Sequence, residues 1–120
     1  MLLVNSNMEV NAQSSTNYLR VAHIVVKEDK LDAYKLALKE GVQTALKREP
    51  GVISIIAVSD NKNPTHITVF ENYASIEAYK SHILTEHFKK YKNTLADMVI
   101  SLELNDVDTI IRGDKKSIIQ

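Results

Sequence analysis

Residues 52–73 read "VISIIAVSDNKNPTHITVFENY", and this stretch decides the fold. Its two ends, Val52–Ser59 and His66–Tyr73, are rich in β-branched and aromatic residues, which favour strands. Between them, Asp60–Pro64 ("DNKNP") carries the Asp, Asn and Pro residues typical of tight turns. The stretch therefore predicts a β-hairpin.

An amphipathic helix is predicted on each side of this hairpin. The first has Asp29 as its expected N-cap and ends at Glu49–Gly51, where the proline disfavours helical geometry in the residue before it. Its apolar stripe comprises Leu31, Tyr34, Leu38, Val42 and Leu46. The second has Ser75 as its expected N-cap. Its stripe comprises Ile76, Tyr79, Ile83, His87 and Tyr91.

Two further strands, Leu19–Lys27 and Met98–Asn105, complete a βαββαβ order. This order predicts the α+β ferredoxin-like fold, in which two helices cover one face of a four-stranded antiparallel sheet. Val52–Ser59 and Met98–Asn105 are apolar on both alternating faces, so we expect a second sheet to cover the other face in a homodimer. The domain spans residues 18–106, and residues 107–120 form a C-terminal arm that we expect to reach over the partner as a short strand.

The composition excludes several classes of protein. Fifteen Lys and Arg balance fifteen Asp and Glu, which argues against binding of nucleic acid or of a charged membrane surface. Without cysteine, the chain has no disulfides, thiolate metal sites or cysteine nucleophile. No apolar run approaches the roughly 20 residues of a membrane span. Residues 1–17 read as a polar tail of a cytoplasmic protein or, alternatively, as the remnant of a signal peptide of a periplasmic or secreted one.

The stretch "SHILTEHFKKY" (Ser81–Tyr91) places two of the four histidines five positions apart. On a continuous helix such residues diverge by about 140°, so they do not form a two-histidine metal site and no metal is expected. Either the helix breaks near Thr85, or the two imidazoles face different surroundings. On a continuous helix, His82 is assigned to a pocket and His87 to the helix end.

The segment from Phe70 to Phe88, "FENYASIEAYKSHILTEHF", resembles the antibiotic biosynthesis monooxygenase domain of the dimeric α/β-barrel superfamily. The resemblance extends from about Leu19 to about Leu104. The matching positions are Glu71, Tyr73, Ala78, His82, His87 and Phe88. Members of this family include quinol and anthrone oxygenases that need no metal or flavin, haem-degrading enzymes and an isomerase of a phosphorylated sugar. The haem-degrading activity is disfavoured, because "FKKYKN" (Phe88–Asn93) lacks the histidine expected to bind the iron.

The resemblance implies a monooxygenase that works without a cofactor on dioxygen and a small phenol, quinol or enol. Two alternatives stay open: an isomerase or tautomerase of a small hydroxyketone, and a dimeric ligand-binding protein without catalysis. The implied catalytic residues are His82 and His23 as candidate bases and Tyr73 as a hydrogen-bond donor, with His23 pointing into a pocket between sheet and helices. The implied substrate contacts are Asn72, His87, Phe88 and Tyr91. A purely structural role is the alternative for each residue.

Overall fold

The computed structural model describes residues 17–115. Its elements are β1 (Tyr18–Val26), the 3-10 helix η1 (Glu28–Lys30), α2 (Leu31–Arg48), β2 (Val52–Ser59), β3 (His66–Tyr73), α3 (Ile76–His82), α4 (Glu86–Leu95) and β4 (Val99–Val107). The predicted βαββαβ order is confirmed, with the second helix divided into α3 and α4. The predicted N-terminal tail, apart from its last residue, and the end of the C-terminal arm lie outside the described residues.

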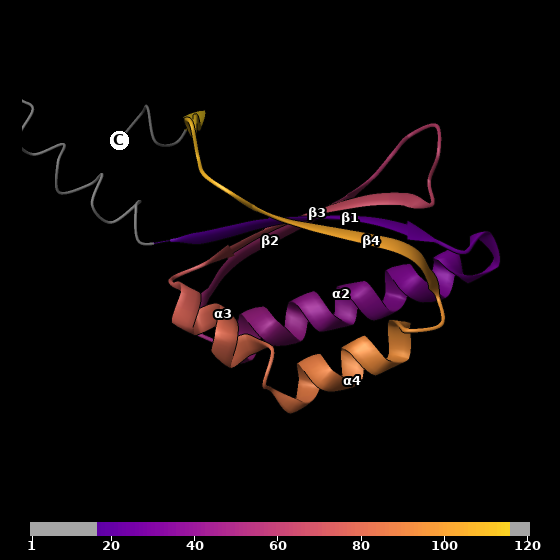
Figure 1. The fold of residues 1–120 in the computed structure, drawn as a ribbon, viewed down its shortest axis with the longest axis horizontal. Coiled ribbons are helices and arrows are strands. Elements are labelled where there is room, and N and C mark those ends of the chain that lie inside the picture. The colour runs from indigo at the N-terminus through magenta and orange to yellow at the C-terminus, as the bar shows by residue number, and fades with distance from the viewer. Residues whose placement is uncertain (1–16, 116–120) are drawn as a thin grey trace, which may run out of the picture.

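The four strands form one antiparallel sheet in the order β2-β3-β1-β4. The predicted hairpin pairs β2 with β3, from Val52 opposite Tyr73 to Ser59 opposite Ile67. Figure 1 shows that α2, α3 and α4 all lie on the same side of the sheet. Among residues 17–115, no helix lies over the opposite side of the sheet.

The core lies between the sheet and the helices. Every second residue of β1 and β3 points toward the helices, as the pleat of a strand requires. The main cluster contains Ala22, Ile24, Val26, Ile67 and Val69 of the strands and Tyr34, Leu38 and Leu95 of the helices. Burial of a large apolar side chain stabilises a fold by roughly 1.5–3 kcal/mol, so this cluster holds the helices on the sheet.

Two glycines let the segments after the hairpin approach the first half of the fold closely. A Cβ on Gly41 in α2 would lie 2.7 Å from the ring of Tyr91 in α4. A Cβ on Gly51, just before β2, would lie 2.6 Å from the Cβ of Ala78 in α3. Both separations are shorter than van der Waals contact, so any larger residue at these positions would push α3 or α4 outward.

The expected cap at Asp29 and the expected end of the last strand differ from the structure. Asp29 is not an N-cap, because Glu28–Lys30 form a 3-10 turn that leads directly into α2. β4 extends to Val107, two residues further than predicted. Residues 108–114 form neither helix nor strand in the single chain, and Ile110 is 99% exposed, so an arm over a partner stays a prediction. No helix within residues 17–115 is long and apolar enough to cross a bilayer.

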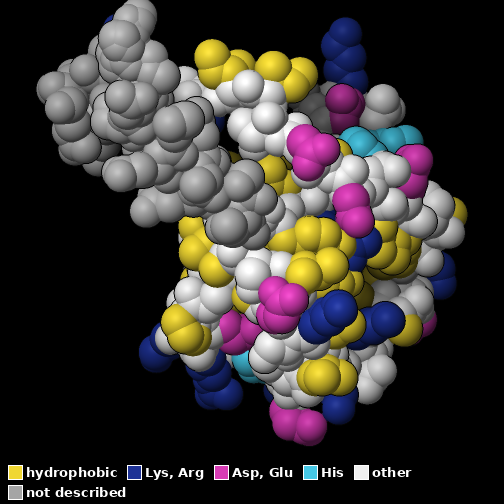
Figure 2. All heavy atoms as spheres, turned by 60° about the vertical axis from the view of Figure 1, so that its left-hand side comes forward, with side chains coloured by type: hydrophobic (Ala, Val, Ile, Leu, Met, Phe, Trp, Pro, Cys, Tyr) yellow, Lys and Arg dark blue, Asp and Glu magenta, His cyan; other side chains and the backbone are white. Residues whose placement is uncertain are grey.

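The helix-free face of the sheet exposes large apolar side chains. Ile56 and Val58 of β2 and Phe70 of β3 are 58%, 49% and 49% exposed, and the strand register places them on this face. The space-filling view, which shows one side of the molecule, likewise has hydrophobic side chains at the surface among acidic and basic ones (Figure 2). Neighbouring exposed apolar side chains on a sheet are typical of a surface that another protein covers.

We predict that the protein is a homodimer closed through this face, with the mass of two chains at micromolar concentration in sizing with light scattering. Ile56→Glu should shift the protein toward monomer, because it would place a charge in an apolar interface. Leu36→Glu is the matched control, since Leu36 is 69% exposed on α2, on the other side of the sheet. A monomeric wild type, or an equal effect of both substitutions, would contradict the prediction.

Candidate active site

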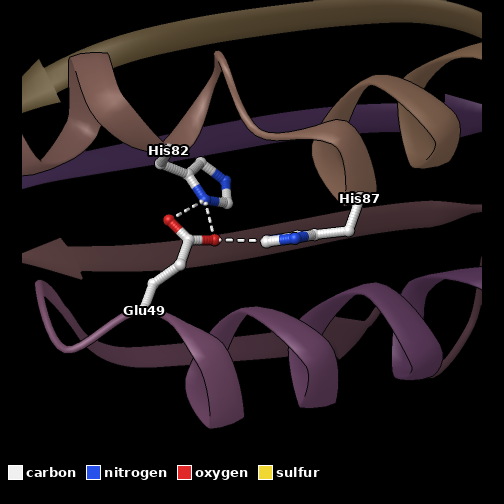
Figure 3. Close-up of side chains that lie close together, drawn as sticks. All are labelled: Glu49, His82 and His87. Atoms are coloured by element: carbon white, nitrogen blue, oxygen red, sulfur yellow. Dashed lines mark hydrogen bonds and ion pairs between the residues drawn. The ribbon is translucent and has the colours of Figure 1, made fainter.

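Three side chains from separate elements meet at one end of the helical layer. Glu49 follows the last residue of α2, His82 is the last residue of α3, and His87 lies in the first turn of α4 (Figure 3). Nδ1 of His82 lies 3.1 Å from Oε1 and 2.9 Å from Oε2 of Glu49. Nε2 of His87 lies 2.5 Å from the same Oε2. The carboxylate therefore bridges the two imidazoles.

The break between α3 and α4 makes this arrangement possible. The hydroxyl of Thr85 donates to the carbonyl oxygen of His82 (2.8 Å) and accepts from the backbone N–H of Phe88 (3.2 Å). A threonine that caps a helix start in this way offers the backbone an alternative to a continuous helix. The prediction of one continuous helix is therefore wrong, and so is the expected divergence of His82 and His87. The alternative, a break near Thr85, is the one observed.

Glu49 owes its position to the proline after it. The residue before a proline is pushed toward extended geometry, and Glu49 has φ −117° and ψ 104°. The chain leaves α2 at this residue, and the Glu49 side chain, 12% exposed, turns toward the histidines. From the sequence, Glu49 was predicted only as part of the helix end. The proline after Glu49 was the one sign in the sequence that this carboxylate is held in place, but nothing in the sequence indicates that it contacts His82.

A cavity of about 80 Å³ lies beside this cluster, between the helices and the sheet. His82, His87, Tyr73, Phe88 and Tyr91 line it, together with apolar residues of α2. These five are among the residues that the family resemblance implied for a site, and the structure brings them together. The ring of Phe88 packs edge-on against His82 at a centroid distance of 4.8 Å, and His82 is 7% exposed. The imidazole is thus held in a largely apolar environment.

One carboxylate, that of Glu71 in β3, lines the cavity itself. The hydroxyl of Tyr73 donates to Oε1 of Glu71 at 2.6 Å. Burial raises the pKa of Tyr73 well above its ordinary value, and the charges of Glu71 and Glu49 raise it further. Burial also raises the pKa of Tyr91, with a contribution from its neighbour Tyr34. Both phenols therefore stay protonated, so neither acts as a base.

The hydrogen bonds to Glu49 define the tautomer of His82. An ionised carboxylate only accepts hydrogen bonds, so Nδ1 of His82 carries the proton that it donates. In the neutral ring, Nε2 then keeps its lone pair and can accept a proton. A carboxylate that orients a histidine in this way is the arrangement by which serine proteases position their base. The cluster is suited to general base chemistry.

Residues 17–94 match the family described as antibiotic biosynthesis monooxygenase. The chain belongs to this family. Among proteins with curated functions, none matches it at a significant level. The family match agrees with the resemblance drawn from the Phe70–Phe88 segment and covers the whole cluster of Glu49, His82 and His87.

Solved structures of other members have the same fold. A candidate antibiotic biosynthesis monooxygenase from Bacteroides thetaiotaomicron is 42% identical, with a TM-score of 0.81, and the match covers 85% of this chain and 97% of that one. A candidate monooxygenase from Lactobacillus acidophilus is 27% identical, with a TM-score of 0.74, over 76% of this chain and 43% of that one. A third, from Nitrosomonas europaea, is 23% identical with a TM-score of 0.73, over 78% and 90%, and supports the fold alone.

Two residues that the resemblance implied for the site lie elsewhere in this family member. His23 is exposed on the helix-free face of the sheet, where its Nδ1 lies 3.4 Å from the hydroxyl of Thr68. The expectation that His23 points into the pocket is therefore wrong. Asn72 precedes Tyr73 on β3 and so points to the opposite face of the sheet from it. Its Oδ1 is buried and has no hydrogen-bond partner among the described residues.

We predict that Thr85→Ala lowers the free energy of unfolding by about 1 kcal/mol, because the substitution removes the cap that starts α4. Chemical denaturation measures the change. Thr94→Ala is the matched control, since the Thr94 hydroxyl is exposed and donates to the carbonyl of Lys90 within the same helix, α4. Loss of the Thr94 hydroxyl should leave the free energy of unfolding nearly unchanged, because alanine is the better helix former. Equal effects of the two substitutions would argue against the capping role.

The raised tyrosine pKa values predict a loss of stability at alkaline pH. Above the ordinary tyrosine pKa of about 10 the unfolded chain releases these protons while the folded chain keeps them. Stability should therefore be fully present below pH 10 and fall as the pH rises further, by up to about 1.4 kcal/mol per pH unit for each tyrosine. Tyr73→Phe and Tyr91→Phe should each flatten this decline in denaturation measurements. An unchanged slope in both variants would refute the assignment.

Proposed function

We propose that this protein is a monooxygenase that inserts one atom of dioxygen into a small electron-rich phenol, quinol or enol, with no metal or organic cofactor taking part. The observation that carries the proposal is the buried His82, oriented by Glu49 beside a cavity lined by aromatic side chains. Membership of the monooxygenase family supports the reaction class, and the site supports the base that this reaction requires.

The reaction begins when Nε2 of His82 takes the proton of the substrate hydroxyl. The resulting phenolate transfers one electron to dioxygen, which gives superoxide and a phenoxyl radical. These combine to form a C–O bond, and the peroxide is protonated. Its O–O bond then breaks with loss of the hydrogen on the same carbon, which gives a quinone and water. One oxygen atom enters the substrate and the other leaves as water, so the substrate supplies all the electrons.

Glu49 supports the charge that develops in the first step. When His82 takes up the proton it becomes an imidazolium, and the carboxylate 2.9 Å from its Nδ1 stabilises that positive charge. The imidazolium in turn stays beside the phenolate and stabilises its negative charge in an apolar pocket. Glu49 is thus a positioning residue, whereas His82 contacts the substrate.

The cavity limits the size of the substrate. Its volume is about 80 Å³, whereas an apolar cavity that binds benzene measures about 150 Å³. Even a single ring therefore requires Phe88 or Tyr91, which line the cavity, to move aside. We expect compounds with one ring, or small enols, to be better substrates than polycyclic ones.

Oxygen consumption on a panel of quinols, anthrones and hydroxyketones, with a metal chelator present, tests the proposal. Isomerisation or tautomerisation of a hydroxyketone would use the same base but consume no oxygen. Binding without turnover of any compound would favour the ligand-binding alternative. Oxygen uptake coupled to quinone formation, at one oxygen molecule for each quinone, is the expected result.

We predict that His82→Ala lowers the rate of oxygen uptake by about 10²–10⁴-fold, the usual contribution of a general base. His66→Ala is the matched control, because His66 is an exposed histidine at the start of β3. Its rate should equal that of the wild type. If both variants retain the full rate, His82 is not the base.

The Glu49→Gln variant tests whether Glu49 positions His82 for catalysis or only stabilises the fold. The change keeps the shape of the side chain but removes the charge that stabilises the imidazolium, so kcat should fall while KM changes little. Glu86→Gln, the same chemical change at a side chain that is 97% exposed, should leave both constants unaltered. A loss of folding without a selective fall in kcat would assign Glu49 to structure alone.

A further inference from the structure

The charge of Glu49 has no cationic side chain beside it. The Glu49 carboxylate is 12% exposed, and within residues 17–115 its ion-pair partners are His82 and His87, with no Lys or Arg within the same distance. In their neutral form the two imidazoles donate hydrogen bonds to the carboxylate but do not cancel its charge. A buried charge without a counter-charge is costly, so this position favours a cation.

Glu71, the carboxylate that lines the neighbouring pocket, adds to the negative charge. Glu71 stands opposite Arg20 of β1 in the sheet register. The guanidinium of Arg20, however, lies 3.3 Å from Asp106 and also donates to the hydroxyl of Tyr79. The Tyr73 hydroxyl donates to Glu71, and the ring of Tyr73 lies 5.4 Å from that of His82, which bonds to Glu49, so the two carboxylates lie at the same end of the pocket.

The three side chains of the cluster offer a known set of metal ligands. One nitrogen of each histidine and one carboxylate oxygen of Glu49 all lie within 4.8 Å of one another. A zinc ion with bonds of about 2.0–2.2 Å holds neighbouring ligand atoms roughly 3 Å apart, so shifts of about 1 Å would complete the site. Two histidines with one carboxylate form catalytic zinc sites and non-haem iron sites in other proteins.

The sequence argument against a metal site made by His82 and His87 rested on their divergence along one helix, and the break at Thr85 removes that argument. Two of the three donor atoms are imidazole nitrogens, which suit transition metals, whereas Mg²⁺ and Ca²⁺ prefer oxygen ligands. The cavity beside both histidines has space for a further small ligand.

We propose that Glu49, His82 and His87 bind one divalent transition-metal ion of the zinc type per chain, and that the bound ion blocks the general base. Coordination through Nδ1 of His82 leaves the single proton of the neutral ring on Nε2. That nitrogen then donates a hydrogen bond and no longer accepts a proton. The inhibitory part of this proposal rests on the proposed monooxygenase function, whereas the metal site does not.

Binding of Co²⁺ and Zn²⁺ to the full-length chain tests the site. We expect one Co²⁺ per chain with a visible ligand-field spectrum, which Zn²⁺ abolishes and a large excess of Mg²⁺ leaves unchanged. Glu49→Gln and His87→Gln should each weaken Zn²⁺ binding in equilibrium dialysis by about 100-fold or more, judged by the 10–100-fold cost of losing even an outer-shell partner. The matched controls, Glu86→Gln and His66→Ala, alter exposed residues of the same kinds and should bind as the wild type does.

A measurement on the wild-type chain tests the same site without relying on the folding of any variant. Co²⁺ should shift the imidazole NMR signals of His82 and His87 strongly and those of His66 weakly. The absence of a stoichiometric Co²⁺ spectrum, or equal binding in the cluster variants and their controls, would overturn the site.

The activity measurement keeps the two proposals separate. With a substrate that the metal-free protein oxidises, one equivalent of Zn²⁺ should suppress oxygen uptake and excess EDTA should restore it. Undiminished or increased turnover with Zn²⁺ bound would overturn the inhibitory role. A chain that binds Co²⁺ at His82 and His87 but oxidises no compound of the panel would retain the metal site and lose the proposed function.

Discussion

The carboxylate of Glu49 lies between the imidazoles of His82 and His87, and the candidate site depends on these hydrogen bonds. They join the end of α2 to the end of α3 and the start of α4, so the same contacts that close one end of the helical layer also orient His82. The bond to Nδ1 leaves Nε2 as the acceptor of the neutral ring. A single buried charge thus serves both packing and proton chemistry.

Three local features of the chain determine the surroundings of this carboxylate. Pro50 forces Glu49 out of helical geometry, Thr85 divides the second helix, and Gly41 admits the ring of Tyr91 against α2. Each feature acts over a few residues, yet together they bring the side chains of Glu49, His82 and His87 together beside one cavity. The proposed general base and the proposed metal site are two states of this cluster, because a metal on Nδ1 of His82 would place a proton on Nε2, the nitrogen that the base needs free.

Much of the fold was predictable from local pattern. The hairpin Val52–Tyr73 and the Ser75 cap followed from alternation, turn residues and capping chemistry, and both are confirmed. The motif from Phe70 to Phe88 was sufficient to indicate the family. The family resemblance implied a site that includes His82, His87, Tyr73, Phe88 and Tyr91, and the structure brings these five side chains to one cavity. What failed was the helical phase, since a single hydroxyl at Thr85 outweighs a periodic apolar stripe.

The sequence by itself determined the order of elements, the hairpin and the family, because these depend on neighbours in the chain and on simple periodicity. Only the tertiary structure decided which side chains face one another. Glu49 stands 33 positions before His82 and joins it only because α2 packs beside α3 and α4. His23 and Asn72 were separated from the pocket by the pleat of the sheet, since the buried face of β1 and β3 is chosen by the helices that cover it. Contacts between distant elements follow from packing of the whole core, which no local pattern encodes.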